Sequence, residues 1–223
     1  AAVQEESIRR PRLAAEAISG RPALRFSGRR EFLHLPRDLV RSQENTVIAV
    51  ARDRGGTTAH RGIFSNWNGK AGNSTTSLFL GLTGKGAVRF SDDFRSTREI
   101  GRPGQAFVVA ASTGRLGTRI MHNGALIGAR PSALTTRNLG GDYVIGQQGN
   151  IDGEYWTGDL AELIAFDRQL ADAELRAVSA FLADKYAIAL AEESWESERT
   201  PEFLALASLC HVLLNTNEFL YVD

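Results

Sequence analysis

Residues 158–186 read GDLAELIAFDRQLADAELRAVSAFLADKY, and this stretch decides the fold. Its first part, residues 160–166, is a short apolar run bounded by a glycine and a polar turn, which favours a buried strand. The apolar residues that follow are spaced as on one face of a helix: Leu175, Val178, Leu182 and Tyr186. The stretch therefore predicts a last core strand and then one amphipathic helix over 171–186.

The chain before this stretch consists of short apolar and alternating runs separated by turns, and it contains most of the 22 glycines. Asn123-Gly124 lies between two such runs and predicts a hairpin with a type I′ turn. GLTGKG at 81–86 lacks the order of a phosphate-binding loop and precedes no helix, so it also predicts a hairpin turn. We therefore predict an all-β fold, a two-sheet antiparallel β-sandwich of jelly-roll type with one packing helix.

The composition divides the chain into four parts. Residues 1–19 are expected to be a linker or a short helix, and residues 20–190 the sandwich. The charged stretch 191–200 reads as an acidic linker. Residues 201–223 begin with a proline after a threonine cap and carry an apolar face, which predicts a helical tail. A lone helix with such a face needs a partner, so we expect this tail to come from a larger parent protein.

Four phrases resemble laminin-G-like domains of the concanavalin A-like lectin and glucanase superfamily. They are the closing stretch itself, GRPALRFSGRREFL at 20–33, HNGALIG at 122–128 and DYVIGQQ at 142–148. The resemblance covers about residues 10–190. It implies a laminin-G-like sandwich, a binding role, calcium at a loop rim in many relatives, and an extracellular or periplasmic location.

The last residues carry a second resemblance. LNTNEFLYVD at 214–223 is similar to the extreme C-terminus of planctomycete cytochrome-c-associated multi-domain proteins. This resemblance implies that other domains of a parent chain are partners of this one. It does not imply a haem in this chain, because no C-x-x-C-H motif occurs in the sequence.

Charge and composition exclude several classes of partner. Lys plus Arg number 26 and Asp plus Glu number 26, so the formal net charge is zero. Nucleic acids and anionic membranes need a basic face, so we expect neither as a partner. The single Cys210 allows no disulfide within the chain, and no apolar run is long enough for membrane insertion. The first residues lack the apolar centre of a secretory signal, which suggests a fragment or a processed product.

Aromatic residues in two loops form the first candidate site. Trp67 and Asn68 lie in one loop, and Tyr155 and Trp156 lie in another. Sugar rings stack their C–H faces on aromatic rings, while amides and carboxylates bind the hydroxyls. The four residues therefore predict a carbohydrate-binding platform. The alternative is that the aromatic rings pack into the core at the strand ends.

Acidic loop residues form the second candidate site. Asn150, Asp152 and Glu154 place three oxygen ligands at alternating positions, which is the donor type that calcium prefers. Asp92 and Asp93 give another acidic loop. The alternative is that these are solvated turn acids without a metal.

Catalysis is not expected. Asp152 and Glu154 are the only convincing pair of alternating carboxylates, and the E-x-D-x-x-E pattern of sandwich glucanases is absent. Asp159 and Glu162 are three apart in a strand and should face opposite sides. The favoured function is a non-catalytic module that binds a glycan or polysaccharide. The alternatives are an interdomain docking module and, more distantly, a polysaccharide hydrolase or lyase.

Overall fold

The computed structural model describes residues 2–35, 39–56, 59–66, 76–100, 103–148 and 153–191. These residues form one short 3₁₀ helix, thirteen strands and one α-helix. The first half consists of η1 Ser7–Arg9, β1 Arg12–Ile18, β2 Arg21–Ser27, β3 Leu33–Leu35, β4 Asn45–Asp53, β5 His60–Ser65 and β6 Phe79–Thr83. The second half consists of β7 Ala87–Phe90, β8 Phe94–Glu99, β9 Ala106–Gly114, β10 Gly117–His122, β11 Ala125–Arg130, β12 Tyr143–Ile145, β13 Thr157–Phe166 and α1 Asp172–Lys185.

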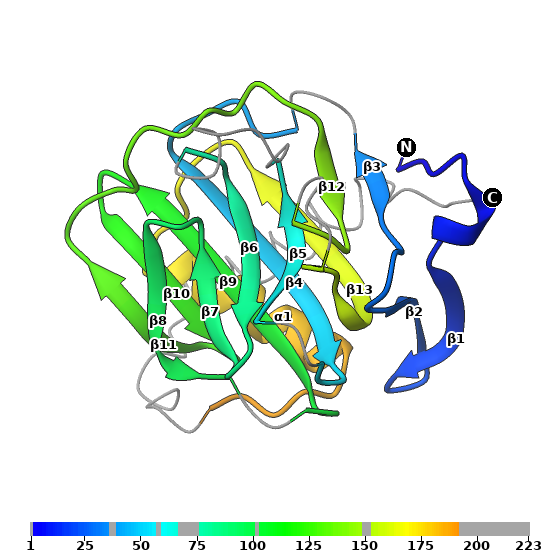
Figure 1. Ribbon diagram of the computed structural model, residues 1–223. Coiled ribbons are helices and arrows are strands. Elements are labelled where there is room, and N and C mark those ends of the chain that lie inside the picture. Colours follow the sequence, from blue (N-terminus) through cyan, green and yellow to red (C-terminus); the bar gives the residue numbers. More distant parts are fainter. Residues whose placement is uncertain are drawn as a thin grey trace.

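The strands form two sheets that pack face to face (Figure 1). One sheet has seven strands in the order β1-β2-β13-β4-β9-β10-β11, and the other has six in the order β3-β12-β5-β6-β7-β8. All the paired strands are antiparallel. The predicted two-sheet antiparallel sandwich with one packing helix is therefore confirmed. The predicted linker at 191–200 and the predicted tail at 201–223 lie outside the described residues, apart from Ala191.

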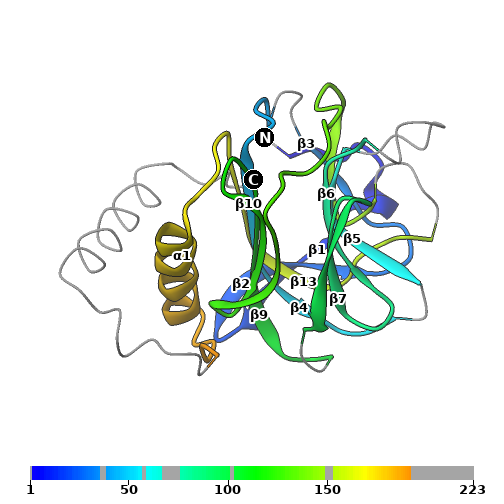
Figure 2. The same ribbon diagram turned by 90° about the vertical axis from the view of Figure 1, so that its left-hand side faces the viewer.

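The seven-stranded sheet is buried on both faces. Along β4, Val47 and Ala49 point into the core between the sheets, while Ile48 and Val50 point to the opposite face. That second face is covered by α1 (Figure 2). The helix contributes the predicted apolar stripe, because Leu175, Val178, Leu182 and Tyr186 are all buried there. The strand-then-helix interpretation of residues 158–186 is confirmed.

The residue before α1 offers no side-chain cap. Ala171 precedes the first helical residue, Asp172, and has no side-chain oxygen to offer. The Glu174 carboxylate instead accepts a hydrogen bond from the Ala171 backbone N–H at 2.9 Å and pairs with Arg168. The helix start is thus held by the acidic residue in its first turn.

The N-terminal assignment was wrong in part. Within residues 1–19, where a linker or short helix was expected, Arg12–Ile18 forms the edge strand β1. β1 pairs with β2 through Arg12 opposite Arg25 and Ala14 opposite Ala23. Its end is buried with the helix-side core at Ala17 and Ile18. Pairing with β2 and burial of its end thus make this segment a strand and not a linker or a helix.

Two hairpin turns lie where the sequence predicts them. Asn123 and Gly124 both have positive φ, +46° and +84°, and join β10 to β11 as the predicted hairpin. Residues 84–86 turn between β6 and β7, so GLTGKG is a hairpin turn and not a phosphate loop.

Candidate functional site

The outer face of the six-stranded sheet holds the candidate site. The α-helix packs against the other sheet, and no α-helix among the described residues covers this face (Figure 2). A cavity of about 280 Å³ opens on it, where β5, β6, β7 and β8 lie next to one another. It is lined by His60, Thr83, Arg89, Ser91, Asp92, Asp93, Phe94 and Arg95.

Strand alternation explains why polar side chains gather here. Val88 and Phe90 of β7 point into the core between the sheets, so Arg89 between them points outward. Arg89 lies opposite Arg95 of β8 in the ladder, and His60 lies opposite Thr83. The outer face of four neighbouring strands is therefore polar at this end.

Arg89 is held in one position by three contacts. Its guanidinium lies 4.6 Å from the centre of the Phe79 ring, a cation–π distance. One nitrogen donates to Gln148 Oε1 at 3.1 Å, and another pairs with the Asp92 carboxylate. The charge of Arg89 is thus already balanced by a carboxylate at the cavity.

A close approach of two backbone segments brings Gln148 and Glu154 to the same place. The Glu154 carbonyl accepts hydrogen bonds from the N–H of Gly62 on β5 and from that of Gln148. A Cβ at Gly62 would lie 2.5 Å from the Gln148 nitrogen, so only glycine permits this approach. As a result the side chains of Gln148 and Glu154 lie beside the Arg89–Asp92 pair.

Three polar atoms around this ion pair lack partners. Among the described residues, His60 Nδ1, Gln148 Nε2 and Glu154 Oε2 are buried and make no hydrogen bond. Buried polar atoms in folded proteins are nearly always hydrogen-bonded, to protein or to a bound molecule. Of the three residues, His60 also lines the cavity.

The same surroundings shift two pKa values in opposite directions. Burial raises the pKa of Glu154, and the nearby Asp92 adds to this while Arg89 opposes it. Burial also lowers the pKa of His60, and the positive charge of Arg89 acts in the same direction against the opposing Asp92. The His60 imidazole is therefore neutral near pH 7 and can accept a hydrogen bond.

The aromatic rings predicted as a platform are not surface rings where the structure describes them. Trp156 has no exposed surface and packs in the core between the sheets. Tyr155 is 5% exposed and packs against Phe32 and Val144. The alternative interpretation, that these rings pack the core at the start of β13, is the one that the structure supports. Trp67 and Asn68 lie outside the described residues.

The predicted calcium ligands are only partly described. Asn150 and Asp152 lie outside the described residues, and Glu154 lies beside the Arg89–Asp92 pair without lining the cavity. Asp92 and Asp93 are engaged by Arg89 and by Arg130, the latter at 2.6 Å. Within the described ranges no three histidine, cysteine or acidic side chains gather as a metal site.

The prediction that Asp159 and Glu162 face opposite sides of the sheet was wrong. The pairing of β13 with β4 shifts between Leu160 and Glu162, which is a β-bulge. The extra residue turns both carboxylates to the face that carries α1. Asp159 is fully buried between Arg25 and Arg52, while Glu162 accepts hydrogen bonds from the end of the helix. Both carboxylates are therefore structural.

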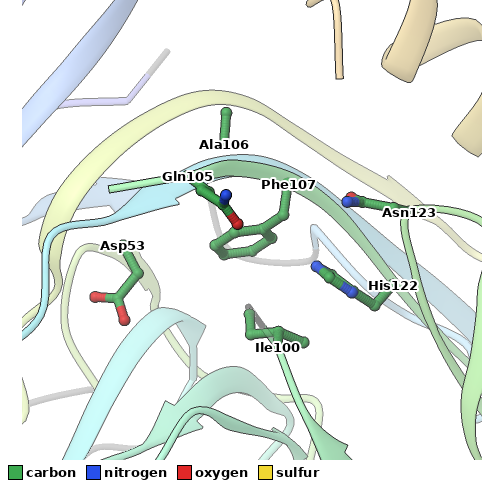
Figure 3. Close-up of a pocket in the computed structure, with 7 residues that line it drawn as sticks. All are labelled: Asp53, Ile100, Gln105, Ala106, Phe107, His122 and Asn123. Atoms are coloured by element: carbon green, nitrogen blue, oxygen red, sulfur yellow. The ribbon is translucent and has the colours of Figure 1, made fainter. Parts of the chain in front are cut away.

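A second, smaller cavity lies at one end of the sandwich. Figure 3 shows its seven lining residues, Asp53, Ile100, Gln105, Ala106, Phe107, His122 and Asn123. Its volume of about 30 Å³ is room for about one water molecule, so it does not fit a sugar.

The chain resembles solved carbohydrate-binding domains in fold. It aligns with domain 4 of AbnA, a GH43 extracellular arabinanase from Geobacillus stearothermophilus in complex with arabinotriose, with a TM-score of 0.57 and 16% identity over 75% of this chain and 81% of that one. It aligns with the CBM40 of the Ruminococcus gnavus IT-sialidase with a TM-score of 0.51 and 18% identity, over 61% and 82% of the two chains. A NanB sialidase from Streptococcus pneumoniae gives a TM-score of 0.57 and 13% identity over 69% of this chain.

These similarities concern the fold alone and agree with a two-sheet β-sandwich. The chain spans 27% of the NanB sialidase chain, so it corresponds to a part of that enzyme. No family model matches the sequence, and no curated protein does. None of the described helices is long and apolar enough to cross a membrane.

Sequence reasoning missed His60, Arg89 and Gln148. One signal for Arg89 was present, because an arginine between Val88 and Phe90 in an alternating run must point away from the core. Gln148 carries no such signal, since its place depends on the crossing over Gly62.

Proposed function

We propose that this chain is a non-catalytic carbohydrate-binding module whose ligand occupies the cavity on the outer face of the six-stranded sheet. The observation that carries the proposal is the polar lining of this cavity, in which the Arg89–Asp92 ion pair lies with His60, Ser91 and Thr83. Such groups lower the free energy of a complex when ligand hydroxyls form hydrogen bonds with them. A volume of about 280 Å³ approaches that of small-ligand sites and suits one or two sugar rings.

The similar domains add support from known proteins. One was solved with arabinotriose, and another is the CBM40 of a sialidase. The absence of catalysis in our proposal rests on the carboxylates that line the cavity. Asp92 and Asp93 are both paired with arginines, which leaves neither free as a nucleophile. The AbnA arabinanase is extracellular, and we place this module outside the cytoplasm as well.

The test is a glycan-array screen of the full chain, first with calcium and then with a chelator. We expect binding that Arg89→Met weakens at least tenfold, because methionine keeps packing on Phe79 but loses the charge and the donors. Arg115→Met, at an exposed ion pair away from the cavity, is the control and should bind like the wild type. Loss of binding on chelation would assign calcium to the module. Equal binding with and without calcium would remove the metal from the proposal.

The competing function is that of an interdomain docking module. It is favoured by two exposed apolar side chains, Ile8 just before the edge strand β1 and Leu13 within it. An exposed strand edge with apolar side chains can pair with another polypeptide. No binding to any glycan in either condition would favour this function over the carbohydrate-binding one.

A further inference from the structure

An arginine row crosses the outer face of the seven-stranded sheet, the face that carries α1. It consists of Arg12, Arg25, Asp159, Arg52 and Arg54. We infer that this row is a second binding surface, which takes an anionic polysaccharide through the carboxylate or sulfate groups of its sugar rings. The row lies on the other sheet from the proposed cavity. The choice of a polysaccharide among polyanions rests on the proposed function, whereas the charge of the row does not.

Strand register places the side chains in one line. Arg12 of β1 lies opposite Arg25 of β2, and Arg25 lies opposite Asp159 of β13. On its other side Asp159 lies opposite Arg52 of β4, and the Arg54 guanidinium reaches the same carboxylate at 3.4 Å. Residues directly opposite one another share a face of the sheet, and neighbouring strands lie about 4.8 Å apart. The row therefore runs across four adjacent strands, perpendicular to them.

The row carries more positive charge than it balances. Its carboxylate, Asp159, is fully buried and accepts hydrogen bonds from Arg25 and Arg52. Arg54 reaches only this same carboxylate among the ion pairs of the described residues. Arg12 makes no ion pair and no hydrogen bond with any described side chain. Four positive charges thus face one negative charge, although the formal net charge of the chain is zero, so the excess is local.

The end of the row at β1 is electrostatically unfavourable without a ligand. Arg12 and Arg25 lie directly opposite each other, and like charges in such a pair destabilise a sheet. Arg25 Nε and Nη2 both donate to Asp159, at 2.6 and 3.3 Å, so the partner of Arg25 lies on the side away from Arg12. An anionic group that pairs with both guanidinium groups removes this repulsion, because paired N–H donors bind oxyanions strongly.

The arginines are accessible, and their arrangement selects the kind of polyanion. Arg12 is exposed, and the Arg25 and Arg54 side chains keep 36% and 43% of their surface exposed. The row crosses the strands and does not follow the free edge of β1, so it fits a polymer that lies over the sheet and not an added strand. None of its residues is aromatic, whereas sites for single-stranded nucleic acids use aromatic rings on which the bases stack.

The experiment is calorimetric titration of the full chain with hexagalacturonate and with neutral galactohexaose, and dextran sulfate in a parallel titration distinguishes sulfate from carboxylate groups. We expect the anionic sugar to bind, with an affinity that falls as salt is raised. Arg12→Gln combined with Arg54→Gln should weaken this binding at least tenfold. Arg41→Gln combined with Arg115→Gln is the matched control. It removes the same charge from exposed arginines beyond the opposite ends of β4 and β9, and should bind like the wild type.

Arg89→Met separates the arginine row from the cavity and should leave hexagalacturonate binding unchanged. A loss in Arg89→Met but not in the row variant would place the anionic sugar in the cavity and overturn the inference while the proposed function stands. Equal binding by both double variants, no binding of either anionic polymer, or tighter binding of a single-stranded oligonucleotide with six phosphates would overturn it too. Failure of neutral glycans to bind, with the row binding intact, would instead count against the proposed function.

Thermal unfolding shows that a loss of binding is not a loss of folding. Arg12→Gln alone should not lower the unfolding midpoint, because it removes a like-charge pair from the sheet. A clear drop in the midpoint of this variant would mean that Arg12 has a structural partner, and would contradict its assignment as a free cation of the row.

Discussion

Replacing His122 should remove part of the acid sensitivity of folding. His122 ends β10 and lies in the small cavity of Figure 3, with its ring centre 5.9 Å from that of Phe107. Burial lowers the pKa of His122 from 6.5 to about 4. Between these values the unfolded chain binds a proton that the folded chain does not. Stability therefore rises with pH across this window and is lost as pH falls, by up to about 3 kcal/mol in total.

Urea unfolding at about pH 7 and about pH 5 measures the effect. The wild type should lose about 2 kcal/mol through His122 alone between these conditions, because about 1.4 kcal/mol corresponds to each pH unit below 6.5. His122→Gln carries no titrating group, so its loss should be smaller by that amount. His122→Phe keeps a ring beside Phe107 and separates the change in packing at neutral pH from the titration. Equal pH dependence in the wild type and both variants would refute the reasoning.

Three further predictions concern stability and are measured as free energies of unfolding in urea. Leu182→Ala should cost about 2–5 kcal/mol, since the side chain is buried between α1 and the sheet, and a loss under about half a kcal/mol would mean that the helix is not packed there. Gly146→Ala should cost about 2–4 kcal/mol, because φ is +85° and the new Cβ would lie 2.2 Å from the Phe26 ring. Gly20→Ala is the control for backbone strain alone, because Gly20 has a similar φ of +74° and open space around it. Equal costs of the two substitutions would contradict the predicted clash with Phe26. Asp159→Asn should cost about 1–3 kcal/mol near neutral pH. The cost should be smaller in acid, because the arginines around the carboxylate lower the pKa of Asp159 below its ordinary value despite burial. A cost that does not diminish in acid would argue against this charge pairing.

The fold could be predicted because its signals are local. The change from a short apolar run to helical spacing within 158–186 needs no knowledge of the rest of the chain, and neither does the Asn123-Gly124 turn. β1 could not be predicted in the same way. Its residues have no strong strand pattern, and Leu13 is 73% exposed. This segment is extended because β2 pairs with it and because Ile18 is covered by the helix-side core.

The site was less accessible to sequence reasoning than the fold. Trp156 was read as a surface ring because its loop is polar, but its backbone N–H donates to the Gly146 carbonyl and its ring turns into the core. The β-bulge after Leu160 likewise changes the face of the sheet on which Glu162 lies. No residue type in the sequence predicts the position of this bulge. Of the acidic residues that the sequence analysis singled out, Asp92 and Asp93 line the cavity, and Glu154 lies beside the Arg89–Asp92 pair. The cavity also needs His60 of β5 and Arg89 of β7, and only the tertiary structure brings these residues together.

The buried carboxylates on the outer face that carries α1 are hydrogen-bonded within the chain, whereas Glu154 near the other outer face keeps an oxygen without a partner. On the face that carries α1, the buried Asp159 receives hydrogen bonds from two arginines, and Glu162 from Lys185 and Tyr186. On the other face, Arg89 is fully engaged, but atoms of its neighbours are buried without partners in the part of the chain that the structure describes. A polar network that is complete stabilises the fold, whereas one that is incomplete gains free energy when a ligand completes it. The helix covers one sheet, so the ligand that we propose binds on the outer face of the other sheet, which no α-helix among the described residues covers.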